Sequence, residues 1–352
     1  MKTFNIAEDT ITTQITVTNG FFDGGVGTLA GSNFTTSSLS ATQKSYYYNI
    51  QYNSKDHFSV TYGHIGGSGS AVESATTEGT TQAIYKQFYN FTETSAENLR
   101  DTAGWSMIDG TNGANAVTQN DVYIITAERL QMKDRLNPGT WTVTLSGSAG
   151  DGSAQTIQLT DDSKTVDAES APFGPRYNIV SGSAGTVQEA YTSKTYGFFY
   201  PDAGLMVLSA NALSSSIGGT TGFVQSGSGY GLAHGNGFKP DTRVTAAADN
   251  ANKIRVALQK GSVTLRSEEQ QYVYDYFCRA KASEFNLSQN LTFWSGSTYA
   301  IRHDDMVTNP QVYISEVGLY DGQNSLVAVG RLSSPINKNF SSEAIVKVRL
   351  TY

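Results

Sequence analysis

The chain of 352 residues contains a single cysteine, Cys278. A disulfide needs two cysteines and a thiolate zinc site needs several, so the sequence excludes both, and we expect the chain to fold in a reducing compartment. No uncharged apolar run approaches the roughly 20 residues of a membrane helix, and Met1 to Thr18 lack the apolar centre of a signal peptide. We therefore expect synthesis in a cytoplasm, with no membrane as a partner.

Charge is also scarce. Only 16% of the residues are charged, against roughly 25% in an ordinary soluble domain. The 24 Lys and Arg are outnumbered by 31 Asp and Glu, giving a net charge of -7. Nucleic-acid binding needs clustered basic residues to neutralise phosphates, so we expect no nucleic-acid partner. The chain is instead rich in Gly, Ser, Thr and Tyr, a composition typical of β-rich proteins.

Three segments alternate apolar and polar residues with the period of two that is typical of β-strands. Residues 11–18 place Ile11, Ile15 and Val17 on one face. Residues 140–159 predict a hairpin, because two alternating runs flank a Gly/Ser/Asp turn at 146–153. Residues 346–352 predict a half-buried final strand.

Helical patterns are fewer. Residues 81–91 carry Ile84, Phe88 and Phe91 at helical spacing, and residues 249–260 carry Ile254 and Leu258 before a helix stop at Gly261. A third candidate follows Ser40, where Gln43 sits as in a capping box and Tyr46, Tyr47 and Ile50 form the apolar stripe. The Gly/Ser-rich stretch from Ser214 to Asn236 predicts a long loop or arm.

These patterns predict a mainly β fold, with β-sandwich-like domains, a few short α-helices and long Gly/Ser-rich loops. We expect four parts along the chain. They are a β-rich part with short helices at 1–136, a β-sandwich-like middle at 137–213, a Gly/Ser-rich arm at 214–240, and a C-terminal β domain with a terminal hairpin at 241–352.

The sequence lacks the common sequence motifs of catalysis and cofactor binding. There is no P-loop, no Gly-X-Ser-X-Gly nucleophile motif, and no zinc-protease spacing among the four histidines, which are His57, His64, His234 and His303. The carboxylate pairs Asp161-Asp162 and Asp304-Asp305 are interpreted as surface turn residues. The loop 109–113 resembles a calcium loop superficially but lacks the oxygen ligand at its fifth position. We expect no catalytic, cofactor-binding or metal-binding residues.

Three aromatic clusters stand out, at residues 46–48, 198–200 and 272–277. Aromatic side chains that stack on nucleic-acid bases are accompanied by basic grooves, which the composition does not support. Tyrosine offers a large contact area with a polar tip, so these clusters favour core packing or subunit interfaces.

The C-terminal third contains a distinctive set of segments at residues 275–281, 284–286, 309–320, 326–336 and 343–348, whose centre reads Ile-Ser-Glu-Val-Gly-Leu-Tyr followed by Leu-Val-Ala-Val-Gly. These segments resemble a module of virion structural proteins of tailed phages. Large contractile-tailed myophages of cyanobacteria are the nearest comparison, and a similar hairpin occurs in tail-fibre and baseplate proteins. Residues 133–141 and 196–204 resemble segments of the same phage proteins.

The resemblance implies a non-enzymatic structural subunit of a virion, placed in the tail or baseplate. Its partners would be other virion structural proteins and further copies of itself, and its location the virion. The hairpin and the final strand supply the expected interaction residues, which are Tyr313, Val317, Leu319, Tyr320, Val327, Val329, Val346, Val348 and Tyr352.

Three alternatives stay open at this point. The first moves the protein to the neck, at the head-tail junction, because the motifs do not fix a position in the particle. The second is a glycan-binding or receptor-binding module at the tail tip, resting on exposed aromatic residues such as Trp105 and Trp294. The third, an enzyme acting on host polysaccharide, needs two converging carboxylates near an aromatic cleft.

Overall fold

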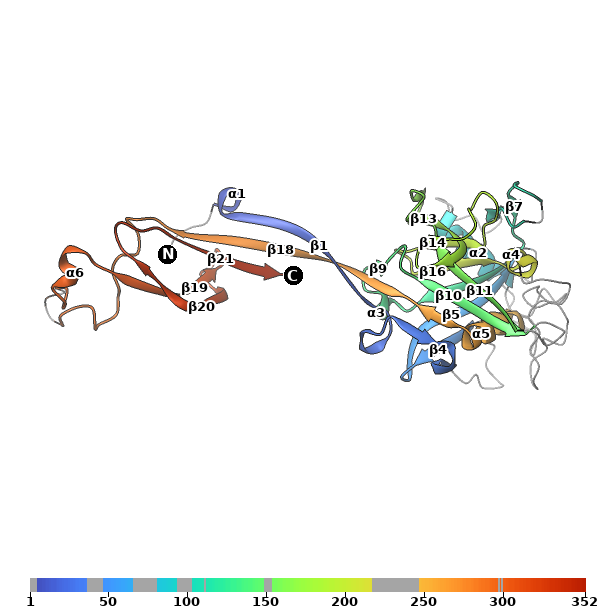
Figure 1. Ribbon diagram of the computed structural model, residues 1–352, viewed down its shortest axis with the longest axis horizontal. Coiled ribbons are helices and arrows are strands. Elements are labelled where there is room, and N and C mark those ends of the chain that lie inside the picture. The colour runs from blue at the N-terminus through green and yellow to red at the C-terminus, as the bar shows by residue number, and fades with distance from the viewer. Residues whose placement is uncertain are drawn as a thin grey trace. The chain divides into compact units, whose positions relative to one another are not determined.

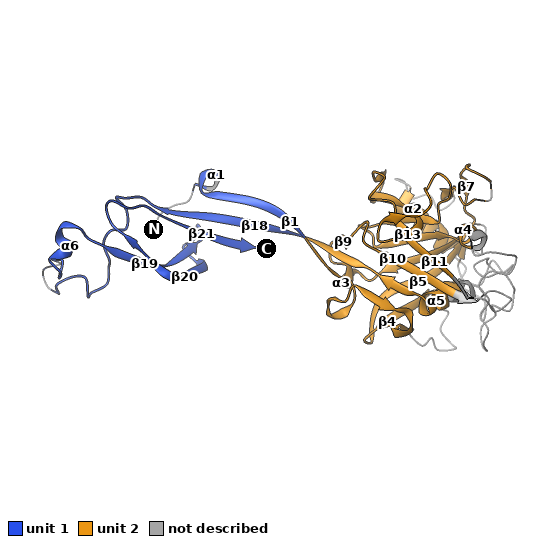
Figure 2. Cartoon of the chain, in the orientation of Figure 1, with its two compact units in different colours: residues 1–16, 270–352 blue, residues 17–269 orange. Residues whose placement is uncertain are grey.

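The computed structural model describes residues 5–36, 47–65, 81–93, 103–110, 112–148, 154–216, 247–296, 298 and 300–352. The chain forms two compact units (Figure 2). Unit 1 comprises residues 1–16 and 270–352, and unit 2 comprises residues 17–269. The predicted mainly β fold is confirmed. The boundaries of these units differ from those of the four parts expected from the sequence, because strands far apart in sequence share one sheet in unit 2.

Unit 2 is built on a 13-stranded sheet whose described strand pairs are all antiparallel (Figure 1). Its path runs through β2 (Thr28–Ala30), β17 (Ser262–Thr264), β10 (Thr142–Ser148), β11 (Ala154–Asp161), β13 (Gly174–Ser183), β15 (Gly197–Tyr200), β16 (Leu205–Ser209), β8 (Asp121–Ala127), β5 (Lys55–His64), β4 (Tyr47–Tyr52) and β3 (Thr35–Thr36), with β12 (Glu169–Ala171) and β14 (Thr186–Val187) paired to β13.

Short elements complete this unit. They are the 3-10 turns η1 (Asp23–Gly25) and η2 (Gly31–Asn33), the helices α2 (Thr81–Glu93), α3 (Arg129–Met132), α4 (Ala210–Ser216) and α5 (Ala247–Lys260), the paired strands β6 (Ser106–Met107) and β7 (Val117–Thr118), and β9 (Arg135–Leu136), which pairs with β18.

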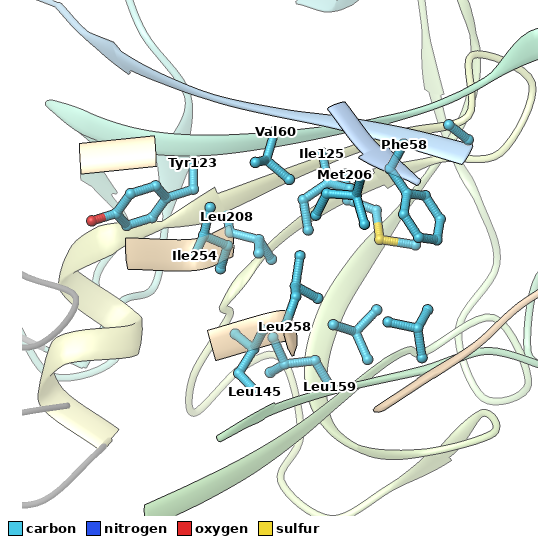
Figure 3. Close-up of a cluster of buried hydrophobic side chains, with 14 of the residues drawn as sticks. Phe58, Val60, Tyr123, Ile125, Leu145, Leu159, Met206, Leu208, Ile254 and Leu258 are labelled. Carbon is cyan, nitrogen blue, oxygen red and sulfur yellow. The ribbon is translucent and has the colours of Figure 1, made fainter. Parts of the chain in front are cut away.

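Helix α5 forms the centre of the main core. It contacts β10 and β17 near one end of the strand order and β5 and β4 near the other, so the sheet curls around it. Figure 3 shows Leu258 between Ile125 of β8 and Leu159 of β11, with Ile254 beside it. Both helix residues are at most 2% exposed, which confirms the stripe expected from their spacing.

Helix α2 covers the opposite face of the central strands. Tyr85 is fully buried, donates a hydrogen bond to the Gln119 carbonyl at 2.6 Å and packs edge-on against Trp105. Strand β8 accordingly alternates between two cores, with Ile125 in the α5 core and Ile124 in the α2 core. Central strands buried on both faces read as continuous apolar runs, which is why period two is absent from their sequence.

An ionic network fixes the C-terminal end of α2 to the sheet. Arg176 donates to both carboxylate oxygens of Glu93 at 2.8 Å, forms an ion pair with Glu169, and lies 4.1 Å above the Phe198 ring. The Tyr200 hydroxyl also donates to Glu93. The Arg176 and Glu93 side chains are each less than one fifth exposed. Their charges are therefore compensated by one another rather than by water.

Most of the local predictions can be compared with the structure. The hairpin is confirmed as β10 and β11, with Leu145 opposite Ile157, and the helices predicted at 81–91 and 249–260 are α2 and α5. The helix predicted after Ser40 is wrong over its described residues, because Tyr47 to Ile50 belong to strand β4, which pairs with β5. Residues 40–46, and residues 217–236 of the predicted arm, lie outside the described residues. No helix in the described part of the chain is both long and apolar enough to span a bilayer.

Unit 1 contains two small sheets and two short helices. Strands β1 (Thr10–Gly20), β18 (Arg266–Ala280) and β21 (Ala344–Thr351) form one sheet, in which β18 is central. Strands β19 (Val312–Tyr320) and β20 (Leu326–Lys338) form a hairpin, and the helices are α1 (Ile6–Asp9) and α6 (Asp305–Thr308). The strand predicted at 11–18 is confirmed as β1, but its expected apolar face is open, since Ile11 is 55% exposed.

Gly261, predicted as a helix stop, directly follows α5, and close packing is what demands a glycine there. A Cβ at this position would lie 1.8 Å from the Thr144 carbonyl oxygen of β10. We expect Gly261→Ala to lower the free energy of unfolding by about 3 kcal/mol, because the backbone of β10 cannot move aside. The measurement is denaturant unfolding followed by fluorescence of Trp105 and Trp141. Gly27→Ala is the matched control, since a Cβ there meets only ordinary contacts at 3.9 Å or more; equal losses for the two variants would contradict the packing argument.

Candidate assembly surface

One face of the β18–β21 pair in unit 1 is uncharged along residues 272–280 and 344–352. The register pairs Tyr274 with Leu350, Tyr276 with Val348 and Cys278 with Val346. Successive side chains of a strand point to opposite sides, so the even-numbered residues of 272–280 and 344–352 share one side. These ten positions hold only Tyr, Cys, Ala, Val and Leu, and we call them the apolar face.

Tyrosines contact one another along this face. The ring of Tyr274 lies 6.3 Å from that of Tyr276 and 5.6 Å from that of Tyr352. Burial, with smaller contributions from Tyr352 and Tyr274, raises the pKa of Tyr276. Even so, Tyr272 is 48% exposed and Tyr352 is 64% exposed. The tyrosines at this end of the apolar face therefore contact one another and remain exposed to solvent.

The opposite face of the same sheet carries a cluster of charged side chains that pair with one another. Asp275 accepts hydrogen bonds from Arg349 at 2.8 and 3.0 Å and forms an ion pair with Lys347 at 2.8 Å. Arg349 first, and then Lys347, hold the pKa of Asp275 well below its usual range. The two faces thus differ in kind, one ionic and internally paired, the other apolar.

The hairpin expected from the sequence is present as β19 and β20. Val317 pairs with Gly330, and Leu319 pairs with Ala328. The connecting turn is closed by Asp321, whose carboxylate accepts hydrogen bonds from the backbone N–H groups of Gln323 at 2.9 Å and of Ser325 at 2.8 Å. An acidic side chain that bonds forward to its own turn fixes the register of the hairpin.

A groove of about 650 Å³ lies between this hairpin and the apolar face. Cys278 and Ala280 of β18, with Val346 of β21, line it on the sheet side, and residues 313–318 of β19 line it on the hairpin side. Burial, together with the negative charge of Asp9, raises the pKa of the Cys278 thiol, so the thiol stays protonated near neutral pH. The charged residues Asp9, Arg279 and Glu316 also line the groove, so its interior combines apolar and charged side chains.

The nine residues expected to make contacts fall into three groups. Leu319 and Val346 are buried. Val317 and Val348 are partly buried, and Tyr320 is nearly half exposed. The side chains that are more than half exposed are Tyr313, Val327, Val329 and Tyr352. The buried pair packs inside unit 1, so only the exposed members are available to another molecule.

Exposed apolar side chains concentrate in unit 1. Of the nineteen large apolar residues that are exposed in the described part of the chain, fifteen belong to unit 1. Several of them come from loops or from the short helix α6, where no periodicity in the sequence indicates them, namely Phe285, Leu287, Leu291, Val307 and Phe340. By contrast, six of the forty-nine buried apolar residues belong to unit 1. Unit 1 therefore has little core of its own and a large apolar surface.

A buried lysine stabilises the loop beside the groove. The Lys338 ammonium is fully buried and donates to the Ala282 carbonyl at 3.0 Å, the Asn286 side chain at 2.7 Å and the Asn339 carbonyl at 2.8 Å. These three acceptors match the three N–H donors of an ammonium group. Lys338 thereby fixes residues 282–286 against the end of β20.

The histidines considered for chemistry lie apart. His57 is fully buried among aromatic rings, where its Nε2 accepts the N–H of Asp23 at 3.2 Å and its Nδ1 lies 3.0 Å from the Lys55 carbonyl. His64 lies 3.6 Å from Asp121, which also accepts from Tyr62. His303 is exposed next to α6, and His234 lies outside the described residues.

The expectation that Asp161 and Asp162 lie at the surface is wrong, since they are 0% and 2% exposed, and each is held inside the protein by accepting backbone N–H groups. Asp161 accepts twice from the Gly139 N–H, at 2.9 and 2.8 Å, and Asp162 accepts from the backbone and side chain of Asn178. Burial raises the pKa of both carboxyl groups. Asp109, from the loop compared with a calcium site, is buried and accepts from Gln119 at 3.1 Å. Asp304 and Asp305 are exposed where α6 begins.

The aromatic residues named for glycan binding are not both available. Trp105 is 1% exposed and donates to the Tyr200 hydroxyl at 3.3 Å, so the expectation that it is exposed is wrong. Trp294 is partly buried and donates to the Ser288 carbonyl at 2.6 Å. Residues 198–200 lie in the two cores of unit 2, as expected for core packing.

Comparison with protein-family models, with curated protein sequences and with solved structures finds no match to this chain. Within the described ranges, no three His, Cys, Asp or Glu side chains lie close enough together to hold a metal ion.

His57 predicts a pH dependence of stability. Burial lowers its pKa below the usual 6.5, and protonation of Nε2 would remove the acceptor for the Asp23 N–H. As the pH falls through 6.5 the unfolded chain takes up a proton that the folded chain does not, so stability decreases, by at most about 1.4 kcal/mol per pH unit. Denaturant unfolding between pH 8 and pH 5 should show a smaller decrease for His57→Gln than for the wild type, whereas the exposed control His303→Gln should match the wild type. Identical pH profiles for all three would contradict the assignment.

Lys338 gives a second stability prediction. Lys338→Met leaves the Asn286 side-chain oxygen without its donor, while the Ala282 carbonyl keeps the Asn286 Nδ2 donor at 2.7 Å and the Asn339 carbonyl keeps the Ser342 N–H at 3.3 Å. The loss should cost about 2 kcal/mol locally. We expect the backbone amides of residues 281–290 to exchange with deuterium at least tenfold faster than in the wild type. The exposed neighbour Lys281 supplies the control, Lys281→Met, for which exchange should be unchanged. Unaltered exchange in Lys338→Met would remove the anchoring role.

Proposed function

We propose that this protein is a non-enzymatic structural subunit of a tailed-phage virion, a tail or baseplate component that assembles with neighbouring virion proteins through unit 1. The observation that carries the proposal is the concentration of exposed apolar side chains on unit 1, combined with its small core. Contiguous apolar surface beyond a few hundred Å² marks a site of protein association. The surface belongs to the segment whose sequence resembles phage virion modules.

The arrangement of unit 1 suits assembly. Its apolar face is preordered by contacts among Tyr274, Tyr276 and Tyr352, so little side-chain entropy is lost when a partner covers it. The charges on the other face of the sheet are already paired, as for Asp275 with Arg349. A partner therefore gains apolar contact area without having to desolvate unpaired charges.

The test is immunogold labelling of intact virions with an antibody raised against the purified chain, viewed by negative-stain electron microscopy. Gold at the distal end of the tail supports the tail or baseplate position. Gold at the head-tail junction would instead place the subunit in the neck. Particles that never label, and from which mass spectrometry shows the protein to be missing, would refute a structural role.

Substitutions on the hairpin test the surface itself. Val327 and Val329 are 58% and 56% exposed, so Val327→Asp combined with Val329→Asp should leave the chain folded. We expect particles made with this double variant to contain at least tenfold less of the protein, measured by quantitative mass spectrometry. The control is Leu130→Asp in unit 2, where a leucine that is 87% exposed is replaced outside the proposed surface. Normal incorporation of the double variant would exclude the hairpin from the contact.

A further inference from the structure

Strand β19 presents an unpaired edge to the groove of unit 1. Six consecutive residues of this strand, 313–318, line the groove. The register of β19 with β20 is irregular between Ile314 and Glu316, within this run. Among the described strands β19 pairs only with β20, so its other edge carries free backbone N–H and C=O groups.

An edge of this kind is a template for a further strand. Unpaired backbone donors and acceptors supply the hydrogen bonds, and the neighbouring apolar positions supply contact area. Val317 and Tyr313 of β19 line the groove together with Cys278 and Val346 of the sheet, and the charged residues Asp9 and Arg279 lie beside them. An incoming extended segment with alternating apolar residues would satisfy both the edge and the groove.

The summed exposed apolar area of unit 1, which is spread over its strands and loops, exceeds what a standard protein interface takes from one partner. A large side chain that is half exposed leaves on the order of 100 Å² accessible. The fifteen exposed apolar residues of unit 1 thus leave on the order of 1,500 Å² per chain, while a standard interface takes about 800 Å² from each partner. Covering little more than half of this surface would form a standard interface.

The charge of unit 1 favours a partner like itself. Residues 1–16 and 270–352 contain eight Lys and Arg against nine Asp and Glu, a net charge of -1, whereas the whole chain carries -7. Two copies of this unit meet without net repulsion, and a strongly acidic or basic partner finds no complementary field. On β19 and β20 the charges of Glu316 and Arg331 already compensate one another at 2.9 Å.

We propose that the free edge of β19 pairs with β19 of a second copy of this chain, so that the groove and the exposed apolar residues beside it are covered in a two-fold symmetric dimer. When the same strand edge of two copies pairs with itself, the assembly is complete as a dimer. Pairing of β19 with β1 or β21 of another copy would leave strand edges free for further copies to add. The inference rests on the proposed function in taking unit 1 as the assembly surface, but it concerns the free protein and is tested in solution.

The experiment uses the purified full-length chain. Sedimentation velocity between 0.5 and 100 µM gives the oligomeric state, and hydrogen-deuterium exchange at the two ends of that range gives the amides that association protects. We expect a dimer at the higher concentration, with the amides of residues 312–320 exchanging at least tenfold more slowly than in the dilute sample. A chain that stays monomeric at 100 µM overturns the proposal, as does a dimer in which exchange of β19 is independent of concentration.

A variant pair completes the test. Tyr313 is 63% exposed, so Tyr313→Lys should fold normally while placing two ammonium groups in the dimer contact. We expect the dimer dissociation constant to rise at least thirtyfold, with no change for the control Leu130→Lys in unit 2, and circular dichroism should be the same for both. Equal dissociation constants for Tyr313→Lys and the wild type overturn the proposal.

The two proposals fail separately. A dimer with protected β19 amides, in a protein that is missing from particles, refutes the virion function and leaves the self-association standing. A monomer in solution that nevertheless labels particles refutes the second copy as the partner of β19 and leaves the virion function standing.

Discussion

The packing of α5 against strands from both ends of the large sheet is the contact on which unit 2 depends. Ile254 and Leu258 reach β10 and β11 on one side and β5 and β8 on the other, so one helix closes a sheet that would otherwise be open and flat. The close approach of β10 follows from it, because the chain passes from α5 through Gly261 into β17 directly beside Thr144. The second core, under α2, forms on the outer face of the same strands.

The two units satisfy the hydrophobic effect in different ways. Unit 2 buries its large apolar residues against its own sheet and helices, including Trp105, Trp141 and Tyr123. Unit 1 consists of narrow sheets of three and two strands, and such sheets cannot cover their own faces. Its apolar residues remain at the surface because the described part of unit 1 supplies no second layer to cover them, and that surface is the basis for the proposed assembly role.

Polar residues inside the protein act on the backbone. Asp161 binds the N–H of Gly139, His57 accepts the N–H of Asp23, and Lys338 donates to carbonyl oxygens at the end of β20. In each case a buried side chain satisfies backbone groups of a turn that no strand pairs. A chain with only 16% charged residues thus uses several of its ionisable groups to hold loops.

The sequence by itself determined the local elements with strong periodicity. The hairpin at Val143 and Leu159, the helix through Ile254 and Leu258 and the hairpin closed by Asp321 all follow from residue spacing and turn chemistry, which act between neighbours in the chain. Only the tertiary structure decided which faces are covered. It placed Tyr47 to Ile50 in a strand beside β5, gave Ile124 and Ile125 opposite cores, buried Leu319 while leaving Tyr313 open, and joined β18 to β1 and β21. Burial depends on contacts between residues hundreds of positions apart, and no local pattern encodes them.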